Sequence, residues 1–263
     1  MKVKTYNIGY CQQFAKIACK AKPFKKIKFW ARTLLLDIPE VGAVLIDTGY
    51  SQHFFKATKK FPYRIYRMIT PVKLDNQMEK TLKKEKVDYV LLTHFHPDHI
   101  GGLKNFPESK WIFLSDGLKN VRGLKGFKAL RKGFIPDLLP EQVPVGSIGL
   151  ESSQFDEFPF SKEFPAVDLF GNQTLFAFEL PGHALGQIGV AFQKGMKWIL
   201  YVADGGWCLE GIRDGSPPNF LGLLVQHDRK QYLETFWKLH HLLKNDKSIE
   251  IITTHGNEEL SYE

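Results

Sequence analysis

The chain has 263 residues, of which 43% are hydrophobic and 24% are charged, the proportions of an ordinary globular protein. It contains no run of about 18 apolar residues, so we expect no transmembrane helix. Its three widely spaced cysteines fit a reducing compartment better than a disulfide framework. Because no signal-like apolar segment precedes the basic stretch at residues 20–28, we expect a cytoplasmic protein without a membrane partner.

The formal net charge is +8, and lysines cluster at residues 20–28 and 80–86. Such clusters can attract phosphate groups, as in enzymes that cleave phosphodiesters, or can form a solvated surface. Lysines mix with glutamates in the second cluster, and no nucleic-acid-binding motif accompanies either one. We therefore favour a solvated surface and expect a small-molecule substrate, which can be anionic, rather than a nucleic acid. The sequence does not fix the oligomeric state.

Apolar runs in the first half predict strands at residues 3–9, 30–37, 43–47, 88–92 and 110–113, with a helix at 75–86. Runs in the second half predict strands at residues 174–179, 188–192, 197–203 and 249–253, with an amphipathic helix at 229–244. Because apolar sheet faces must be covered, we expect two facing sheets with helices on both outer faces. The prediction is a single α/β domain over residues 1–263.

Two segments, residues 50–74 and 118–165, fall outside this regular pattern and are rich in aromatic side chains. Long irregular stretches inside a domain are usually functional or disordered, and the aromatic content disfavours disorder. We expect these insertions to shape the substrate site as a largely apolar wall. The alternative is that they form a small satellite core or a dimer interface.

A cluster of potential metal ligands follows the predicted strand at residues 88–92. His94, His96, Asp98 and His99 place three imidazoles and a carboxylate within six residues. Imidazole nitrogens and carboxylate oxygens are ligands for divalent transition metals, and such crowding does not suit a hydrophobic core. The sequence therefore predicts a metal site at this strand end.

Three further candidates each follow a strand-like run. His183 comes after residues 175–180, Asp204 after residues 198–203, and His255 after residues 249–254. Taken alone, each could be an ordinary turn or helix-capping residue. Their shared position at strand ends makes them candidates, and a resemblance to a known family implies that they belong to the same site.

The pattern H-x-H-x-D-H at residues 94–99 resembles the signature of the metallo-β-lactamase superfamily of αββα metallohydrolases. The motifs P-G-H at residues 181–183, Asp204 and His255 follow in the family's order, and D-T-G at residues 47–49 resembles the turn that supports the metal loop. The resemblance covers residues 40–256. It implies a four-layer αββα metallo-β-lactamase sandwich.

The resemblance also implies two bound divalent metal ions. His94, His96 and His183 would hold one, Asp98, His99 and His255 would hold the other, and Asp204 would bridge them. Zinc is the expected metal, with iron and manganese as alternatives, because His and Asp ligands accept all three. Asp98 would also orient the nucleophile or pass a proton to the leaving group. Asp47 is expected to support a ligand histidine from behind.

The function implied is metal-dependent hydrolysis by a metal-bridging hydroxide, with a lactone or carboxylic ester bearing a hydrophobic portion as substrate. N-acyl homoserine lactonases are the most similar members, although Trp207 stands where they carry a tyrosine, and Gln187 where many members carry a histidine. The alternatives are a phosphodiesterase or nuclease-like hydrolase and an inactive metal-binding scaffold.

Overall fold

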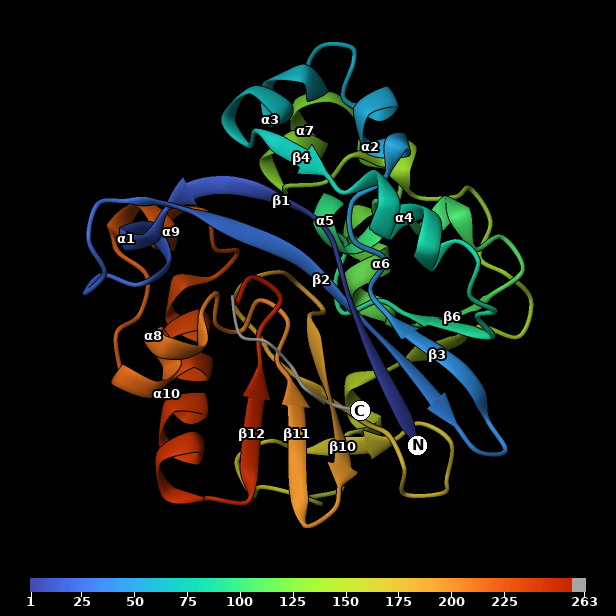
Figure 1. The fold of residues 1–263 in the computed structure, drawn as a ribbon, viewed down its shortest axis with the longest axis vertical. Coiled ribbons are helices and arrows are strands. Elements are labelled where there is room, and N and C mark those ends of the chain that lie inside the picture. The colour runs from blue at the N-terminus through green and yellow to red at the C-terminus, as the bar shows by residue number, and fades with distance from the viewer. Residues whose placement is uncertain (257–263) are drawn as a thin grey trace. The chain divides into compact units, whose positions relative to one another are not determined.

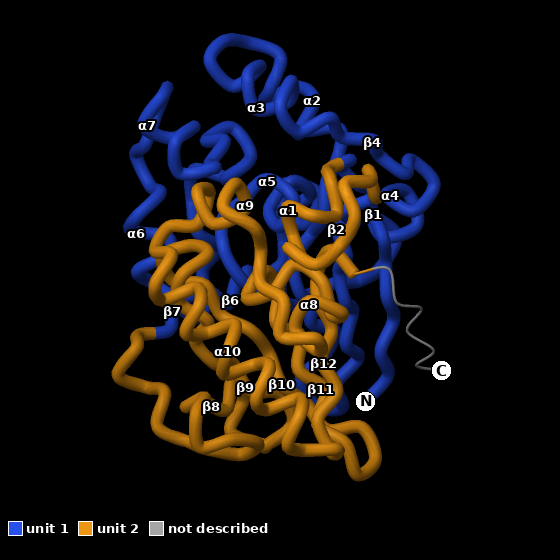
Figure 2. The backbone as a smooth tube through the Cα atoms, turned by 90° about the vertical axis from the view of Figure 1, so that its left-hand side faces the viewer, with its two compact units in different colours: residues 1–12, 28–150, 258–263 blue, residues 13–27, 151–257 orange. Residues whose placement is uncertain are grey.

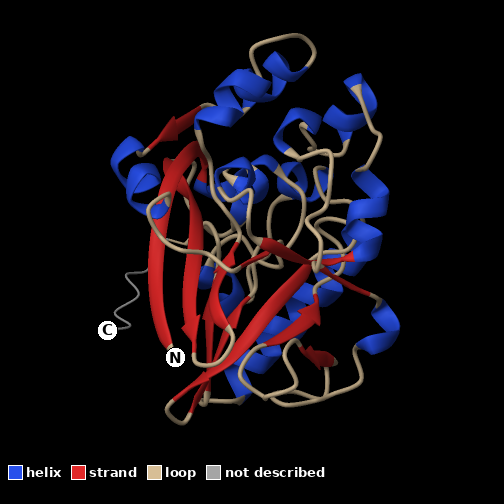
Figure 3. Ribbon diagram, turned by 90° about the vertical axis from the view of Figure 1, so that its right-hand side faces the viewer, coloured by secondary structure: helices blue, strands red, loops and turns tan. Residues whose placement is uncertain are grey.

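The structure, a computed structural model, describes residues 1–256. It divides into two compact units, one of residues 1–12 and 28–150 and the other of residues 13–27 and 151–256 (Figure 2). The last seven residues of the predicted domain, 257–263, lie outside the described part. Each unit is built around one β-sheet with helices beside it, which confirms the predicted α/β class with two sheets (Figure 3).

The sheet of the first unit has seven strands in the order β4-β1-β2-β3-β5-β6-β7. Their bounds are β1 (Lys2–Phe14), β2 (Lys26–Ile38), β3 (Gly42–Ile46), β4 (Val72–Leu74), β5 (Tyr89–Leu91), β6 (Lys110–Leu114) and β7 (Ile148–Leu150). β3, β5, β6 and β7 run parallel, whereas β4 pairs antiparallel with β1 and β3 pairs antiparallel with β2. Parallel strands bring their carboxyl ends to one edge, and the ligand motif follows β5 at that edge.

Short helices connect these strands (Figure 1). They are α2 (Gln52–Ala57), α3 (Tyr63–Ile69), α4 (Asn76–Leu82), α5 (Pro97–Ile100), α6 (Ser115–Val121) and α7 (Gly126–Arg131), with 3-10 turns η1 (Leu103–Asn105) and η2 (Pro136–Leu138). Side-chain caps begin two of them: Ser51 accepts from the His53 N–H at α2, and Asp75 accepts from two backbone N–H groups at α4. The segments predicted as irregular therefore contain helices, each too short to show a 3.6-residue period in the sequence.

Several aromatic and aliphatic side chains of these two segments are buried in the core of the first unit. Phe54, Phe134, Ile135 and Leu138 are at most 2% exposed and belong to the same hydrophobic cluster as the sheet residue Trp111. These side chains pack against the sheet of the first unit. The predicted role of the two segments in shaping the substrate site stays a prediction for their other side chains.

The sheet of the second unit has five strands in the order β12-β11-β10-β9-β8. They are β8 (Ala166–Asp168), β9 (Phe176–Glu179), β10 (Ile188–Lys194), β11 (Lys197–Tyr201) and β12 (Ile249–Ile252). The remaining elements of this unit are α1 (Ala15–Ala18), η3 (Ser152–Gln154), α8 (Leu209–Asp214), α9 (Phe220–Leu224) and α10 (Arg229–Asn245). β11 and β12 run parallel, and the chain between them passes through α8, α9 and α10.

Helix α10 covers this sheet with an apolar stripe. Its Asp228 cap accepts from the backbone N–H groups of Lys230 and Gln231, and its buried residues recur at helical spacing from Tyr232 to Leu239. The helix packs against α8 and β12. No helix among residues 1–256 combines the length and the apolar composition needed to cross a bilayer.

The nine strands predicted from the sequence are all found within residues 1–256. The strands β4, β7 and β8 were not predicted, because three residues are too few for an alternating pattern to be recognised.

Candidate metal centre

The first ligand group lies in the first unit, beyond the ends of β3 and β5. Ile46 pairs with Leu91 in parallel register, so the residues that follow each strand emerge side by side. The Asp47 N–H donates to the Leu91 carbonyl at 2.8 Å, and the ligand motif begins three residues after Leu91, at His94. Asp47 adopts φ 58°, a left-handed conformation that Asp tolerates better than most residues.

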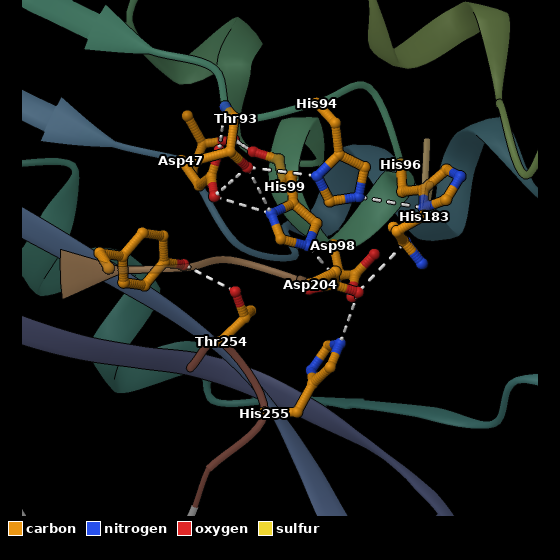
Figure 4. A network of polar contacts seen from close by, with 12 residues as sticks. Asp47, Thr93, His94, His96, Asp98, His99, His183, Asp204, Thr254 and His255 are labelled. Atoms are coloured by element: carbon orange, nitrogen blue, oxygen red, sulfur yellow. Dashed lines mark hydrogen bonds and ion pairs between the residues drawn. The ribbon is translucent and has the colours of Figure 1, made fainter. Parts of the chain in front are cut away.

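Asp47 supports His99 from behind, as expected from the sequence (Figure 4). Asp47 Oδ2 lies 2.7 Å from His99 Nδ1, and the Thr93 N–H donates to Asp47 Oδ1 at 2.9 Å. Because a carboxylate accepts hydrogen bonds, it favours the tautomer of His99 with the proton on Nδ1. The lone pair is then on Nε2, which is the nitrogen left to bind a metal.

The turn at residues 47–49 also fixes the backbone of the ligand motif. The N–H and the hydroxyl of Thr48 both donate to the His99 carbonyl at 2.8 Å, and the Gly102 N–H donates to the Thr48 hydroxyl at 3.0 Å. A methyl group at Gly101 would lie 2.7 Å from the Gly49 carbonyl oxygen, so only glycine allows this close approach. The D-T-G and H-I-G-G segments therefore form one packed unit.

The imidazoles of this group converge. His94 Nε2 lies 3.0 Å from His96 Nδ1, with the two rings 81° apart, and the ring centroids of His94 and His99 are 3.9 Å apart. Asp98 Oδ2 lies 3.8 Å from His99 Nε2. All four predicted ligands of the first unit are thus brought together. They offer nitrogen and oxygen atoms that suit a divalent metal.

Gly133, in one of the two segments predicted to shape the substrate site, approaches this group. It adopts φ 62°, and a methyl group placed on it would lie 2.8 Å from His96 Nε2. The segment after α7 therefore runs beside His96, with glycine at the point of contact.

His183 is held in the second unit by a turn that requires glycine. Gly182 has φ 122°, and a methyl group there would lie 2.1 Å from the Tyr232 backbone nitrogen in α10. The Gly182 carbonyl accepts from the Asp228 N–H at 2.9 Å, and the His183 carbonyl accepts from the His227 N–H at 3.1 Å. The P-G-H motif thus docks the His183 loop on the N-terminus of α10.

Asp204 and His255 come together because of the strand register. Tyr201 of β11 pairs with Ile252 of β12, and each ligand follows three residues beyond its strand partner. His255 Nε2 lies 3.1 Å from Asp204 Oδ2. Ala203, just before Asp204, adopts φ 44°, a conformation that costs an L-residue about 1–2 kcal/mol. Strain of this kind collects where the fold fixes a functional side chain.

Three side-chain nitrogens meet at one oxygen of Asp204. His183 Nε2 lies 3.3 Å and His255 Nε2 3.1 Å from Oδ2, and the Trp207 indole N–H donates to the same oxygen at 3.0 Å. These four side chains are at most 9% exposed. The second unit thus brings its three predicted ligands together, and Trp207 fixes the orientation of their shared carboxylate.

Sequence reasoning missed Gln226, which supports His183. Its Oε1 lies 2.7 Å from His183 Nδ1, and its Nε2 donates to the Gly222 carbonyl at 2.8 Å. The amide orientation is therefore fixed, with the acceptor oxygen toward the imidazole, and His183 presents Nε2 as its ligand atom. No motif in the sequence marks a glutamine between α9 and α10.

Two buried polar residues near the P-G-H turn and Asp204 have unusual surroundings. Gln187 is 1% exposed, and neither polar atom of its side chain has a hydrogen-bond partner among residues 1–256. Burial and the charge of Asp204 hold the pKa of Tyr232 well above its usual value, so its hydroxyl stays protonated.

The cysteines take no part in either group. Cys11, Cys19 and Cys208 form no disulfide bond, and burial raises the pKa of Cys208 to about 12. A thiol with this pKa stays protonated near neutral pH and is a poor nucleophile.

One stretch of the chain matches the model of a known family. Residues 33–112 match the family model of the metallo-beta-lactamase superfamily. That stretch contains the turn at residues 47–49 and the ligand motif at residues 94–99. The resemblance to the metallo-beta-lactamase superfamily is confirmed.

Curated relatives carry metallo-hydrolase descriptions. A probable metallo-hydrolase of Mycobacterium tuberculosis is 26% identical over 184 residues, which are 65% of this chain and 55% of that protein. The metallo-hydrolase mfmC of Annulohypoxylon moriforme is 25% identical over 111 residues, which are 41% of this chain and 27% of that protein. The chain thus spans about half the length, or less, of these relatives.

Solved structures share the metallo-beta-lactamase fold over nearly the whole chain. AiiA of B. thuringiensis, with N-decanoyl-L-homoserine bound at its active site, gives a TM-score of 0.70 at 16% identity, covering 97% of this chain and 93% of that one. A probable metal-dependent hydrolase of Staphylococcus aureus gives 0.66 at 12% identity, covering 97% and 88%. AidC, a dizinc quorum-quenching lactonase, gives 0.60 at 15% identity, covering 97% and 87%. At these identities the likeness concerns the fold alone.

Proposed function

We propose that the two ligand groups act together as a dinuclear metal centre of a hydrolase. His94, His96 and His183 would hold one metal, Asp98, His99 and His255 the other, and Asp204 would bridge them. The observation that carries the proposal is that each group converges by itself on nitrogen and carboxylate donors. In each group a buried acceptor also fixes a histidine tautomer, Asp47 for His99 and Gln226 for His183. In metalloproteins, a hydrogen-bond acceptor of this kind commonly fixes the tautomer and the ring orientation of a metal-binding histidine.

The proposed reaction is the hydrolysis of a lactone or carboxylic ester. When bound, the metals would make water a nucleophile near neutral pH and take up charge from the substrate carbonyl. The hydroxyl of water would join the acyl carbon, the acyl C–O bond would break, and the proton released by the water would pass to the leaving alkoxide. We propose that Asp98 carries this proton to the leaving group. It lies among the proposed ligands, and its side chain is 12% exposed, so a substrate can reach it.

We propose that the hydrophobic part of the substrate lies against the segment that follows α7. The contact of Gly133 with His96 supports this placement, because it puts that segment beside a proposed ligand. The buried side chains of the segment belong to the core, so the substrate would meet its backbone and its remaining side chains. AiiA, whose fold is shared, has N-decanoyl-L-homoserine, a molecule with a long acyl chain, bound at its active site.

Trp207 is the main departure from the lactonase pattern. Its indole N–H is engaged with Asp204 at 3.0 Å and cannot take the role of a phenol toward a substrate carbonyl. We therefore propose that the substrate is an ester or lactone other than an acyl homoserine lactone. Its carbonyl would be polarised without help from a side chain at position 207.

Phosphodiester hydrolysis is the second candidate. It is favoured by one observation, the concentration of lysine and arginine in residues 51–74 and 117–136 of the first unit. A substrate with an anionic phosphate would be attracted to such a surface.

The test pairs metal analysis with a hydrolysis panel of acyl homoserine lactones, aryl esters, a thioester and bis-aryl phosphodiesters, each with and without chelator. Two metals per chain and chelator-sensitive lactone or ester turnover are expected. Turnover of phosphodiesters alone would favour the second candidate. Fewer than one metal, or no turnover, would indicate an inactive scaffold.

Variants at the proposed ligands sharpen this test. His96→Ala and Asp204→Ala should lose metal and activity while keeping the circular dichroism spectrum of the parent. The exposed His241 on α10 provides the matched control, and His241→Ala should leave both quantities unchanged. Full activity in both ligand variants would contradict the assignment.

A further inference from the structure

The positive charge of the chain is concentrated in two stretches of the first unit. Residues 51–74 and residues 117–136 each contain six lysine or arginine residues and no aspartate or glutamate. Together they hold a third of the 36 basic residues of the chain and none of its 28 acidic residues. The two stretches therefore carry a dense positive charge, as does the lysine cluster at residues 20–28.

The two stretches meet at helices α3 and α7, which pack against each other (Figure 1). The Gly126 N–H at the start of α7 donates to the Tyr63 hydroxyl at the start of α3 at 2.8 Å. The rings of Phe61 and Phe127 are in contact, with their centroids 5.5 Å apart. Basic side chains of both stretches thus flank one shared surface.

Large apolar side chains stand out from this α3–α7 surface. Phe61 and Met68 are 70% exposed, Ile69 is 65% exposed and Phe127 is 55% exposed. Helix α3 has no buried residue at all. Exposed basic residues lie between these side chains along the chain: Lys60 precedes Phe61, Arg64 stands one turn before Met68, and Lys128 follows Phe127. Apolar side chains grouped in this way mark an interaction site.

We propose that the α3–α7 surface binds peripherally to bilayers that contain anionic lipid. The basic side chains would lie at the headgroups, and Phe61, Met68, Ile69 and Phe127 would enter the boundary between headgroups and acyl chains. This mode of binding needs no membrane-spanning helix. It revises the expectation from the sequence that the protein has no membrane partner.

The chemistry of the surface disfavours the other occupants. A second copy of the chain would bring two strongly basic surfaces together, which like-charge repulsion opposes. A nucleic acid would satisfy the basic residues and could stack on Phe61 and Phe127, but it would leave the aliphatic side chains of Met68 and Ile69 in water. An anionic bilayer satisfies both kinds of side chain at once.

Vesicle sedimentation of the full chain tests the proposal. We expect binding to phosphatidylcholine vesicles with about one third phosphatidylserine and much weaker binding to phosphatidylcholine alone. Raising the salt from about 0.1 M to about 1 M should weaken the binding, because the Debye length falls from about 10 Å to about 3 Å. Equal binding to both kinds of vesicle, or binding to neither, would overturn the proposal.

Variants identify the surface. Each basic residue near an anionic bilayer contributes about fivefold to the partition coefficient, so Lys60→Gln with Lys128→Gln should lower it about 25-fold. Phe61→Ser with Phe127→Ser should lower it at least about tenfold. Lys238→Gln and Met196→Ser, at exposed positions of the second unit, are the matched controls and should not change it. Equal losses in the controls would contradict the placement.

Two further measurements do not depend on a loss of binding. A tryptophan introduced as Phe61→Trp should be quenched by brominated lipid in anionic vesicles, whereas one introduced as Met196→Trp should not. Fluorescence anisotropy with a labelled single-stranded RNA should show weaker binding than to anionic vesicles at the same salt. Tighter binding to the RNA, with no quenching at position 61, would contradict the bilayer proposal and indicate that the partner is a nucleic acid.

Discussion

His99 Nδ1 lies 2.7 Å from Asp47 Oδ2, and both side chains are fully buried. The carboxylate reaches this position because Asp47 follows β3 while His99 belongs to the loop and helix that follow the neighbouring parallel strand β5. The contact fixes the orientation of an imidazole before any metal arrives. The strength of metal binding should therefore depend on a residue that is not itself a ligand.

Replacing Asp47 with asparagine tests this dependence. Asn tolerates the left-handed backbone at this position and keeps an acceptor oxygen, but it removes the charge behind His99. We expect Asp47→Asn to lower zinc affinity about 10- to 100-fold, measured by competition with a chromogenic chelator. Asp116→Asn, on the exposed face of α6, should leave the affinity unchanged. Equal affinities in the two variants would contradict the role of Asp47.

Gln226 gives a second, independent test on the other ligand group. Gln226→Leu removes the acceptor from His183 Nδ1 and should lower zinc affinity about 10-fold or more, whereas the exposed Gln231→Leu should not. Gln226→Glu places a carboxylate behind His183, as Asp47 stands behind His99, and should restore or exceed the parent affinity. If Gln226→Glu binds zinc as weakly as Gln226→Leu, the amide does not act through the His183 tautomer.

Gly133 and Gly126 form a matched pair for testing crowding at His96. Their φ angles are 62° and 59°, but an added methyl group meets His96 only at Gly133 and meets nothing within 4 Å at Gly126. Both alanine variants should lose about 1–2 kcal/mol of stability from the left-handed backbone. Only Gly133→Ala should also lower metal content, measured by mass spectrometry of the intact protein or by elemental analysis. Equal metal content in both variants would show that His96 moves freely.

Gln187 should lower the free energy of unfolding of the protein. Its side-chain amide is buried without a hydrogen-bond partner among residues 1–256, which costs about 1–3 kcal/mol relative to a satisfied or exposed amide. We expect Gln187→Leu, which has similar volume, to raise the free energy of unfolding by about 1 kcal/mol in urea titrations. A loss of activity together with a gain in stability would indicate that the amide serves the substrate. A loss of stability would mean that the amide is satisfied in solution.

Glu85 should make stability depend on pH. Hydrogen bonds from Lys4 at 2.8 Å and from the Tyr6 hydroxyl at 2.6 Å hold the pKa of Glu85 below its ordinary value of 4.5. Because the folded-state pKa is depressed, the stabilisation is present above about pH 4.5 and is lost as the pH falls below it. Glu85→Gln should therefore be less stable than the parent at neutral pH, by at most about 1 kcal/mol. The difference should shrink in acid, and the exposed Glu108→Gln should show no such trend.

The sequence predicts strand ends well and contacts between distant side chains poorly. Asp204 and His255 could be assigned because each ends a run of buried, largely β-branched or aromatic residues, and runs of this kind survive in the structure as β11 and β12. Gln226 could not be assigned, because its contact with His183 joins positions 43 residues apart through a turn and a helix. Such a contact leaves no local pattern.

The segments at residues 50–74 and 118–165 show a different limit. Their aromatic content correctly excluded disorder, but it does not say which rings face inward. Phe54 and Phe134 complete the core, whereas Phe61 and Phe127 stand in solvent, and all four have the same side chain. Helices of six or seven residues, such as α2, α3 and α7, are too short for periodicity to separate the two faces.

The crossover between β11 and β12 also has a consequence for how the protein folds. Asp204 and His255 become neighbours only after the chain between them, with α8, α9 and α10, has closed over the sheet. Closing a connection of this length is slow compared with forming a hairpin. The four ligands at residues 94–99, in contrast, are local in the chain. The proposed dinuclear centre would therefore be completed only late in folding.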